Sequence, residues 1–417
     1  MDKFIIEGGH KLHGTLNVSG AKNAILPIMT AALLAKGKST LTNVPNLIDL
    51  KTMAHLLRII GARVDYEDST MVIDGTDVCY SEAPYELVSK MRASIYVLGP
   101  LLARLGEARV SFPGGCSIGN RPVDLHLKAM EALGAHIDIE HGYIVAKTKK
   151  LRGGTISFEI SSVGATINAL MAAVLADGTT EIFNAAVEPE VTSTIEFLQH
   201  MGAKISGLET THLVVEGVKE LNPTKMEMIP DRIEAGTFLL AAPITNSEIT
   251  VANCYPMHLI SLLDKMKDAG IECKVSDREI TVYPPSKIKA VDVTTYPYPG
   301  FPTDLQAQFL TLMTLANGTS HIQDTIFPDR FMHVPELNRL QAKIRQEGNL
   351  AIVEGVHHLS GAEVMATDLR ASAALVLAGL AAEGKTIVSR IYHIDRGYDK
   401  IEEKLNHAGA KIERVIS

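Results

Sequence analysis

A unit of about seventy residues recurs six times along this 417-residue chain, and no other feature of the sequence constrains the fold as strongly. Each unit contains a charged amphipathic helix, then a tight turn, then a run that alternates between polar and apolar residues and so predicts a strand. The turn position, a glycine in five of the six units, recurs at intervals of 73, 68, 68, 71 and 68 residues, at Gly61, Gly134, Gly202, Gly270, Gln341 and Gly409.

The last unit differs from the other five because the chain ends before a second alternating run can follow the first. At the other end of the chain, the alternating run Phe4-Ile5-Ile6 has no partner nearby in the sequence. We expect this opening run to pair with the last unit as its missing strand, so that the first and last residues close the set of repeats.

A second helix in each unit is apolar on nearly every side, and such a helix must be buried. The six copies span residues 24–35, 94–105, 165–176, 235–244, 305–316 and 371–382. A residue suited to a left-handed helix C-cap follows each copy, namely Gly37, Gly106, Gly178, Asn246, Gly318 and Gly384. Each unit therefore reads as helix, strand, helix and hairpin in an α/β fold, with the apolar helix inside and the sheet outside.

The chain is too long for one ordinary core, so the six units are expected to divide three and three. Residues 22–229 would form one domain, and residues 1–21 together with 230–417 the other. We expect a small-molecule site in the cleft between them. A solenoid that only presents a binding surface is the alternative, which is less favoured because solenoid repeats are usually shorter and lack reactive loops.

Composition excludes several classes of protein. The chain is 46% hydrophobic and 21% charged, which is typical of globular proteins, and its net charge of −8 argues against general nucleic-acid binding. No apolar run approaches the roughly 20 residues of a membrane span, and the first residues lack the apolar core of a signal peptide. The four cysteines have no paired spacing, which fits a reduced, cytoplasmic setting. The fifteen histidines form no metal-binding motif, so no metal is expected.

Short polar stretches precede the apolar helices, and each supplies residue types that cap helix N-termini. Four of the six also supply a basic residue, at Lys22, Arg92, Arg232 and Arg370. A cation is unfavourable there because the helix dipole is already positive. We therefore expect several helix starts and cations to converge on a phosphate or carboxylate. For any single basic residue the alternative is that its side chain points into solvent.

One loop breaks the repeat. Residues 111–122 contain three glycines together with Cys116 and Arg121, where the other units run directly from strand to helix. Structural cysteines are usually buried among apolar neighbours, whereas this one has polar neighbours, so we expect an exposed thiol whose thiolate Arg121 favours. Cys116 is therefore a candidate catalytic residue. The other three cysteines lie in strand-like or apolar contexts and are expected in the core: Cys79, Cys254 and Cys273.

Seven strings resemble one enzyme family, the UDP-N-acetylglucosamine 1-carboxyvinyltransferases of the EPSP synthase-like superfamily. They lie at residues 19–23, 113–119, 121–126, 162–166, 330–337, 366–372 and 392–398. The resemblance covers the whole chain and implies a two-domain inside-out α/β barrel. It also implies transfer of the enolpyruvyl group of phosphoenolpyruvate to the 3-hydroxyl of UDP-N-acetylglucosamine, with release of phosphate. This reaction is the first committed step of peptidoglycan synthesis; it needs no cofactor.

The resemblance also implies roles for individual residues. Cys116 matches the general acid, which the epoxide antibiotic fosfomycin alkylates, and Asp304 matches the carboxylate that takes the sugar hydroxyl's proton. Residues matching phosphoenolpyruvate contacts are Lys22, Asn23, Arg121, Asp368, Arg370 and Arg396. Residues matching nucleotide-sugar contacts are Asn23, Arg92, Arg121, Pro122, Val123, Asp124, Leu125, Ser161, Val163, Gly164, Asp304 and Ile326. For Val163 and Ile326 the alternative is a packing role.

Two positions depart from the family pattern. Ile160 replaces a basic residue that some members have, which puts one nucleotide phosphate contact in doubt, and Gln341 replaces the usual glycine of the repeat turn. Two rival functions stay open. The shikimate-pathway enolpyruvyl transferase shares the repeat but lacks the Pro-Gly-Gly-Cys loop, and a non-catalytic nucleotide-sugar sensor would not need the reactive residues. The sequence does not indicate the oligomeric state.

Overall fold

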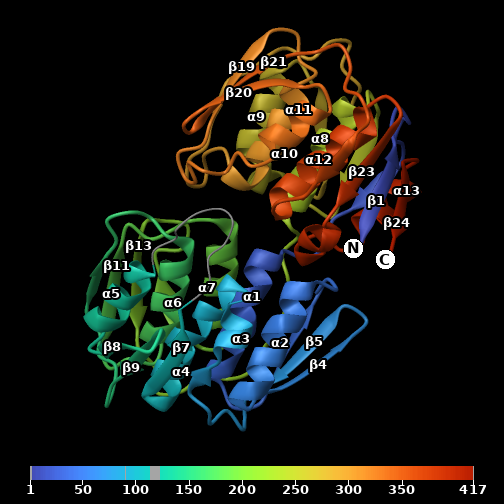
Figure 1. Ribbon diagram of the computed structural model, residues 1–417. Coiled ribbons are helices and arrows are strands. Elements are labelled where there is room, and N and C mark those ends of the chain that lie inside the picture. The colour runs from blue at the N-terminus through green and yellow to red at the C-terminus, as the bar shows by residue number, and fades with distance from the viewer. Residues whose placement is uncertain (1, 90, 113–122, 417) are drawn as a thin grey trace. The chain divides into compact units, whose positions relative to one another are not determined.

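The computed structural model describes residues 2–89, 91–112 and 123–416, and these residues form two compact units (Figure 1). Unit 1 contains residues 2–19 and 230–416, and unit 2 contains the described residues between 20 and 229. Each unit has its own hydrophobic core. The domain boundaries expected from the repeat, 21/22 and 229/230, stay a proposal, as does the cleft expected between the domains.

The described residues form six sheets of four strands, and each sheet joins one parallel pair to two antiparallel pairings. In unit 2 the strands are β3 (Lys38–Thr42), β4 (Arg63–Glu67), β5 (Thr70–Asp74), β6 (Glu82–Ala83), β7 (Glu107–Ser111), β8 (His136–Glu140), β9 (Tyr143–Lys147), β10 (Thr155–Ser157), β11 (Thr179–Phe183), β12 (Lys204–Ser206), β13 (His212–Glu216) and β14 (Lys225–Glu227). Its helices are α1 (Lys22–Ala31), η1 (Ala32–Leu34), α2 (Ile48–Ile60), α3 (Tyr85–Val88), η2 (Arg92–Val97), α4 (Leu98–Leu105), α5 (Asp124–Ala132), α6 (Val163–Ala173) and α7 (Pro189–His200).

Unit 1 repeats the same plan. Its strands are β1 (Lys3–Glu7), β2 (Thr15–Asn17), β15 (Ile249–Ala252), β16 (Cys273–Val275), β17 (Glu279–Val282), β18 (Val293–Thr294), β19 (Thr319–Gln323), β20 (Lys343–Glu347), β21 (Leu350–Glu354), β22 (Glu363–Met365), β23 (Lys385–Ser389) and β24 (Lys411–Val415). Its helices are α8 (Arg232–Ile244), η3 (Pro256–Leu259), α9 (Ile260–Asp268), η4 (Thr303–Leu305), α10 (Gln306–Met313), α11 (Val334–Arg339), α12 (Leu369–Ala381), η5 (Ile391–Arg396) and α13 (Ile401–His407).

Strand β1 closes the last sheet, as the sequence predicts. It lies between β23 and β24 and pairs antiparallel with both, so that Ile6 faces Thr386 on one side and Ile412 on the other (Figure 1). The residues of β1 alternate between buried and half-buried, with Phe4 and Ile6 in the core. The last repeat is therefore completed by residues from the opposite end of the chain.

The apolar helices are buried as expected. Every residue of α10 is buried, as are all but the first of α8, because apolar side chains on all faces can be satisfied only by surrounding protein. The sheets cover these helices with one buried face, for example in β5, where Met71 and Ile73 are buried and their neighbours are partly exposed. Ala, Leu and Ile at these positions allow the close helix contacts that this arrangement needs.

At four of the six apolar helices, the glycine that follows the helix has a different role from the one predicted. All six of the following residues have positive φ, but only Gly106 directly follows its helix as the C-cap, and Asn246 comes one residue later. The other four stand three or more residues beyond the last helical residue and directly before a strand, as Gly178 does before β11. Their left-handed conformation turns the chain into the strand, so the C-cap prediction is wrong at these four positions.

Two further predictions need correction. Side chains cap three of the six apolar helices, at Ser162, Asp231 and Asp368, whereas α1, α4 and α10 begin without a capping side chain. Cys79 is exposed, because it lies in a loop after β5 and not in a strand, so its assignment to the core is wrong. Cys254 is buried as expected.

Candidate active site

Asp304 is the centre of the charged cluster in unit 1. It lies in η4, the short helical turn that precedes the buried helix α10, and its side chain is 25% exposed. Arg330 donates from Nη1 to its Oδ1 at 2.7 Å, and Arg370 donates from Nη2 to its Oδ2 at 2.7 Å. The arginine side chains are only 6% and 5% exposed. One carboxylate therefore lies between two buried guanidinium groups.

The pKa of Asp304 follows from this arrangement. Burial by itself would raise the pKa of the carboxyl group, but the charges and hydrogen bonds of Arg370 and Arg330 outweigh burial and hold the pKa well below its usual value. Asp304 is consequently an anion at neutral pH. Because both of its oxygens accept charge-assisted hydrogen bonds, it becomes a stronger base only when one of these arginine contacts is lengthened or shared with a ligand.

A buried neutral network orients Arg370. The Tyr398 hydroxyl lies 3.5 Å from Nη1 of Arg370 and 2.8 Å from Oγ1 of Thr237. Gln308 donates from Nε2 to the backbone carbonyl of Asp304 at 3.0 Å and lies 3.2 Å from the Thr237 hydroxyl. These contacts join α8, α10 and α12 around the cluster, so the starts of three apolar helices meet in unit 1.

Of the other predicted residues of unit 1, Asp368 lies at a helix start, whereas Arg396 and Ile326 do not. Asp368 is buried and caps α12, because its Oδ1 accepts from the backbone N–H groups of Arg370 at 2.8 Å and Ala371 at 3.1 Å. Arg396 ends η5 and is half-buried, and Ile326 is half-buried in the loop after β19. His333 is buried between the charges of Asp368 and Arg330; burial is the main cause that lowers its pKa to about 4.

In unit 2 the basic residue at the start of α1 is also paired within the protein. Nζ of Lys22 donates to Oδ2 of Asp49 at 3.2 Å, and the two side chains are only 11% and 6% exposed. Neither Lys22 nor Arg370 therefore points into solvent, so that alternative is wrong for both. Asn23 is the next residue of α1 and is half-buried.

The predicted nucleotide-sugar contacts of unit 2 lie at three further helix starts. Arg92 begins η2, Asp124 and Leu125 begin α5 after Val123, and Val163 and Gly164 begin α6 after Ser161. Arg92, Leu125, Ser161, Val163 and Gly164 are half-buried, Val123 is buried, and Asp124 is exposed. Cys116, Arg121 and Pro122 lie outside the described residues.

Sequence reasoning missed two members of these clusters as site residues. Arg330 lies within a family-like string, but its partner Asp304 is 26 residues away, and Asp49 is 27 residues from Lys22. No local pattern links such pairs.

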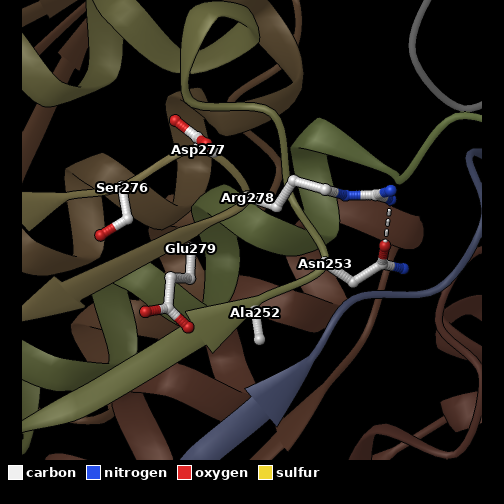
Figure 2. Close-up of a pocket in the computed structure, with 6 residues that line it drawn as sticks. All are labelled: Ala252, Asn253, Ser276, Asp277, Arg278 and Glu279. Carbon is white, nitrogen blue, oxygen red and sulfur yellow. Dashed lines mark hydrogen bonds between the residues drawn. The ribbon is translucent and has the colours of Figure 1, made fainter.

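An open hollow of unit 1 lies elsewhere. It measures about 740 Å³ and is lined by Ala252, Asn253, Ser276, Asp277, Arg278 and Glu279, at the end of β15 and around the β16–β17 turn (Figure 2). Arg278 donates to Oδ1 of Asn253 at 2.6 Å. None of the predicted site residues lines it, and it is wide open, so it is not the candidate active site. The described residues contain no group of three metal-ligating side chains, and no described helix is long and apolar enough to cross a membrane.

Comparison with known proteins shows the family to which this chain belongs. The family description "EPSP synthase (3-phosphoshikimate 1-carboxyvinyltransferase)" matches residues 6–405. The UDP-N-acetylglucosamine 1-carboxyvinyltransferase of Desulfosudis oleivorans is 55% identical over 415 residues, which cover 100% of both chains. The protein of the same name from Chloroherpeton thalassium is 57% identical over 417 residues, 99% of this chain and 97% of that one.

Solved structures show the same fold. The enolpyruvyl transferase NikO from Streptomyces tendae superposes with a TM-score of 0.91 at 26% identity, covering 100% of this chain and 99% of that one. EPSP synthase from Acinetobacter baumannii superposes with a TM-score of 0.78 at 18% identity over the whole of both chains. The predicted α/β fold of enolpyruvyl transferases is confirmed. The resemblance found in the sequence motifs is confirmed as well, since the chain belongs to the EPSP synthase family, in its UDP-N-acetylglucosamine 1-carboxyvinyltransferase branch.

Proposed function

We propose that this protein transfers the enolpyruvyl group of phosphoenolpyruvate to the 3-hydroxyl of UDP-N-acetylglucosamine and releases phosphate. The observation that carries the proposal is that more than half of all residues, over the whole chain, are identical to enzymes named for this reaction. The shikimate-pathway alternative has no comparable support, because the EPSP synthase structure is only 18% identical. The reaction begins peptidoglycan synthesis, which fits a cytoplasmic enzyme whose substrates are both phosphorylated metabolites.

The reaction is an addition followed by an elimination. C3 of the enol accepts a proton while the sugar oxygen bonds to C2 and loses its own proton. In the second step C3 returns a proton and the C2–O bond to phosphate breaks, which restores the enol double bond. The protein must therefore supply an acid near C3, a base near the sugar hydroxyl, and cations for the carboxylate and phosphate.

We assign the base to Asp304. Its carboxylate is ionised at neutral pH, because Arg330 and Arg370 keep its pKa low. The same arginines make it a weak base in the unliganded protein, so substrate binding has to loosen at least one of the two 2.7 Å contacts before proton transfer. An anionic substrate can do this, since a phosphate or carboxylate competes for the guanidinium groups.

The remaining roles follow the family pattern and stay proposals. Cys116 is the general acid at C3. Lys22, Arg121, Arg370 and Arg396 hold phosphoenolpyruvate, with Asp368 and Asn23 beside it. The nucleotide sugar contacts the helix starts of unit 2 and, from unit 1, Asp304 and Ile326. Ile160 is 72% exposed and supplies no charge, so no basic group at this position contacts the nucleotide phosphates.

The deciding experiment is phosphate release from phosphoenolpyruvate with and without UDP-N-acetylglucosamine. We expect release only in the presence of the sugar, together with one enolpyruvyl product for each phosphate. A nucleotide-sugar sensor would bind the sugar and release no phosphate, so that result would exclude the enzyme.

The role of Cys116 has a matched control in the chain. Cys116→Ser is expected to lose most turnover and all covalent labelling by fosfomycin. Cys79→Ser, which removes an exposed thiol that has no place in the proposed site, is expected to keep both. Labelling that persists in Cys116→Ser would assign the reactive thiol to another cysteine.

A further inference from the structure

One buried amide joins the helix starts of unit 2. Asn168 lies in α6 and is fully buried. Its Oδ1 accepts from the backbone N–H of Gly99 at 2.9 Å, and its Nδ2 donates to the backbone carbonyl of Ile95 at 2.9 Å. The same Nδ2 lies 2.9 Å from Nδ1 of His126 in α5. Every hydrogen of the amide is thus used, and the three partners belong to η2, α4 and α5.

Backbone partners determine how this amide is oriented. The N–H of Gly99 can only donate, so it requires Oδ1, and the carbonyl of Ile95 can only accept, so it requires Nδ2. His126 must therefore accept at Nδ1, which leaves its single proton on Nε2 and keeps the ring neutral. Burial is the main cause that lowers the pKa of His126 to about 4, and the nearby charge of Arg92 lowers it further. A protonated ring would place two donors against each other.

Two glycines show how closely this network approaches the backbone. A Cβ added at Gly99 would lie 2.8 Å from Oδ1 of Asn168 and 2.6 Å from its backbone oxygen. A Cβ added at Gly164 would lie 3.0 Å from Cε1 of His126. Larger residues at either position would displace the amide or the ring. The imidazole of His126 thus lies directly against Gly164, the second residue of α6.

The segments joined by this network are those that carry the candidate sugar contacts of unit 2. Ile95 lies in η2, which begins at Arg92, and His126 lies in the first turn of α5, beside Asp124 and Leu125. Gly164 and Val163 begin α6, the helix of Asn168 itself. A shift of Asn168 would move all three segments.

We infer that Asn168 is a positioning residue for nucleotide-sugar binding, because its amide, with His126, holds in register the three helix starts that contact the sugar nucleotide. This inference rests on the proposed function and goes beyond it. The side chain of Asn168 bonds to Ile95, Gly99 and His126, none of which is a predicted substrate contact, so Asn168 acts on the sugar only through the segments that it joins. A purely structural asparagine would affect stability alone, whereas a positioning residue affects one substrate selectively.

The test compares three variants of the full chain. Asn168→Leu keeps the volume and removes every polar contact, and His126→Asn keeps an acceptor close to the place of Nδ1. Thr30→Val is the matched control, because Thr30 is a fully buried polar residue of another apolar helix in the same unit, and its hydroxyl donates to Pro27 O and to Met171 Sδ, outside the Asn168 network. Each protein is titrated with UDP-N-acetylglucosamine by calorimetry, and KM for each substrate and kcat are measured.

For Asn168→Leu we expect the Kd and KM for the nucleotide sugar to rise about tenfold or more, since misplacing several contacts at once is costly. The KM for phosphoenolpyruvate and kcat at saturating sugar should change by less than about threefold. The reason is that the hydrogen bonds of Asn168 go to none of the residues proposed to hold phosphoenolpyruvate. His126→Asn should show a smaller rise, and Thr30→Val none. Sugar affinity within twofold of the wild type in folded Asn168→Leu, or equal losses for both substrates, would overturn the inference.

A second measurement keeps this inference separate from the proposed function. Amide hydrogen exchange of the unliganded proteins should show faster exchange at residues 92–99, 124–128 and 163–168 in Asn168→Leu than in Thr30→Val. Unchanged exchange in these three segments would show that Asn168 does not hold them in place, whatever the protein binds. If the wild type shows this protection but neither binds nor converts the sugar, the proposed function is wrong, whereas the structural role of Asn168 in joining the three segments is supported.

Discussion

In both units a buried polar network joins the starts of several helices, but the network of unit 1 is charged and that of unit 2 is neutral. In unit 1 the helix starts gather around a carboxylate between two buried arginines, supported by Tyr398 and Gln308. In unit 2 the shared partner of three helix starts is a neutral amide, Asn168, with a neutral histidine. Both networks are buried, and both join segments that lie far apart in the sequence.

The difference indicates that the two networks have different roles. Charges in a buried cluster are strongly coupled, so a small displacement changes the basicity of Asp304 by a large amount. A satisfied neutral network does not titrate near neutral pH and holds its segments in one arrangement. The Asp304 cluster of unit 1 thus has the properties of a reacting centre, and the Asn168 network of unit 2 those of a rigid support, although unit 2 also holds the buried Lys22–Asp49 ion pair. Four substitutions test this contrast.

The largest effect is expected from Asp304→Asn. The amide cannot accept the sugar proton and leaves Arg330 and Arg370 beside an uncharged group, so kcat should fall about 10²- to 10⁴-fold. Asp277→Asn, in the open hollow of the same unit, is the control and should leave kcat unchanged. The contrast with Asn168→Leu is the essential point, since that variant should mainly change the KM for the sugar. A fall of less than threefold for Asp304→Asn would remove it from the role of base.

The one buried ion pair at the start of α1 tests whether unit 2 also depends on charge. Asp49→Asn leaves the ammonium of Lys22 buried without its partner and should lower the unfolding free energy by about 3 kcal/mol. The double variant Lys22→Met/Asp49→Leu should regain most of that stability in urea unfolding yet show no turnover. Recovery of turnover in the double variant would show that Lys22 serves packing and not phosphoenolpyruvate.

Acid should weaken both units through their buried histidines. The pKa values of His126 and His333 are lowered to about 4, whereas histidines in the unfolded chain titrate near the ordinary pKa of 6.5. Between pH 6.5 and 4 the unfolded state binds more protons, so stability falls as the pH falls through this window, by on the order of 3 kcal/mol for each histidine. Hydrogen exchange at pH 7 and pH 5 measures the loss in each unit.

In this experiment His126→Asn should flatten the pH dependence of unit 2 and leave that of unit 1. His136→Asn, which changes a histidine whose side chain is 78% exposed, is the control and should alter neither. An unchanged slope in His126→Asn would show that His126 is not the acid-sensitive group of unit 2.

The smallest effect concerns the repeat itself. Gln341 has φ of 68° at a turn where Gly134 of unit 2 has φ of 87°, and an L side chain is strained there. Gln341→Gly should therefore stabilise the protein by about 1 kcal/mol in urea unfolding. Gly134→Ala should destabilise it by a similar amount, since an added Cβ at Gly134 meets no atom and only the backbone conformation changes. Equal effects of the same sign would refute this explanation.

Much of the candidate site could be located from the sequence because helix starts are marked by local residues. Lys22, Arg370 and Asp368 were found there, and the structure places each at the start of its apolar helix. The partners could not be found in the same way. Asp49, Arg330 and Asn168 lie 27, 26 and 42 residues from Lys22, Asp304 and His126, and no local pattern links them to these residues.

The sequence by itself determined the sixfold repeat, the burial of the apolar helices and the pairing of β1 with the last repeat. These features depend on the periodicity of apolar residues, which is written locally along the chain. Only the tertiary structure decided the charge state of Asp304, the neutral tautomer of His126 and the exposure of Cys79. Those properties depend on which distant groups approach within hydrogen-bonding distance and on how much water is excluded, and periodicity carries no information about either.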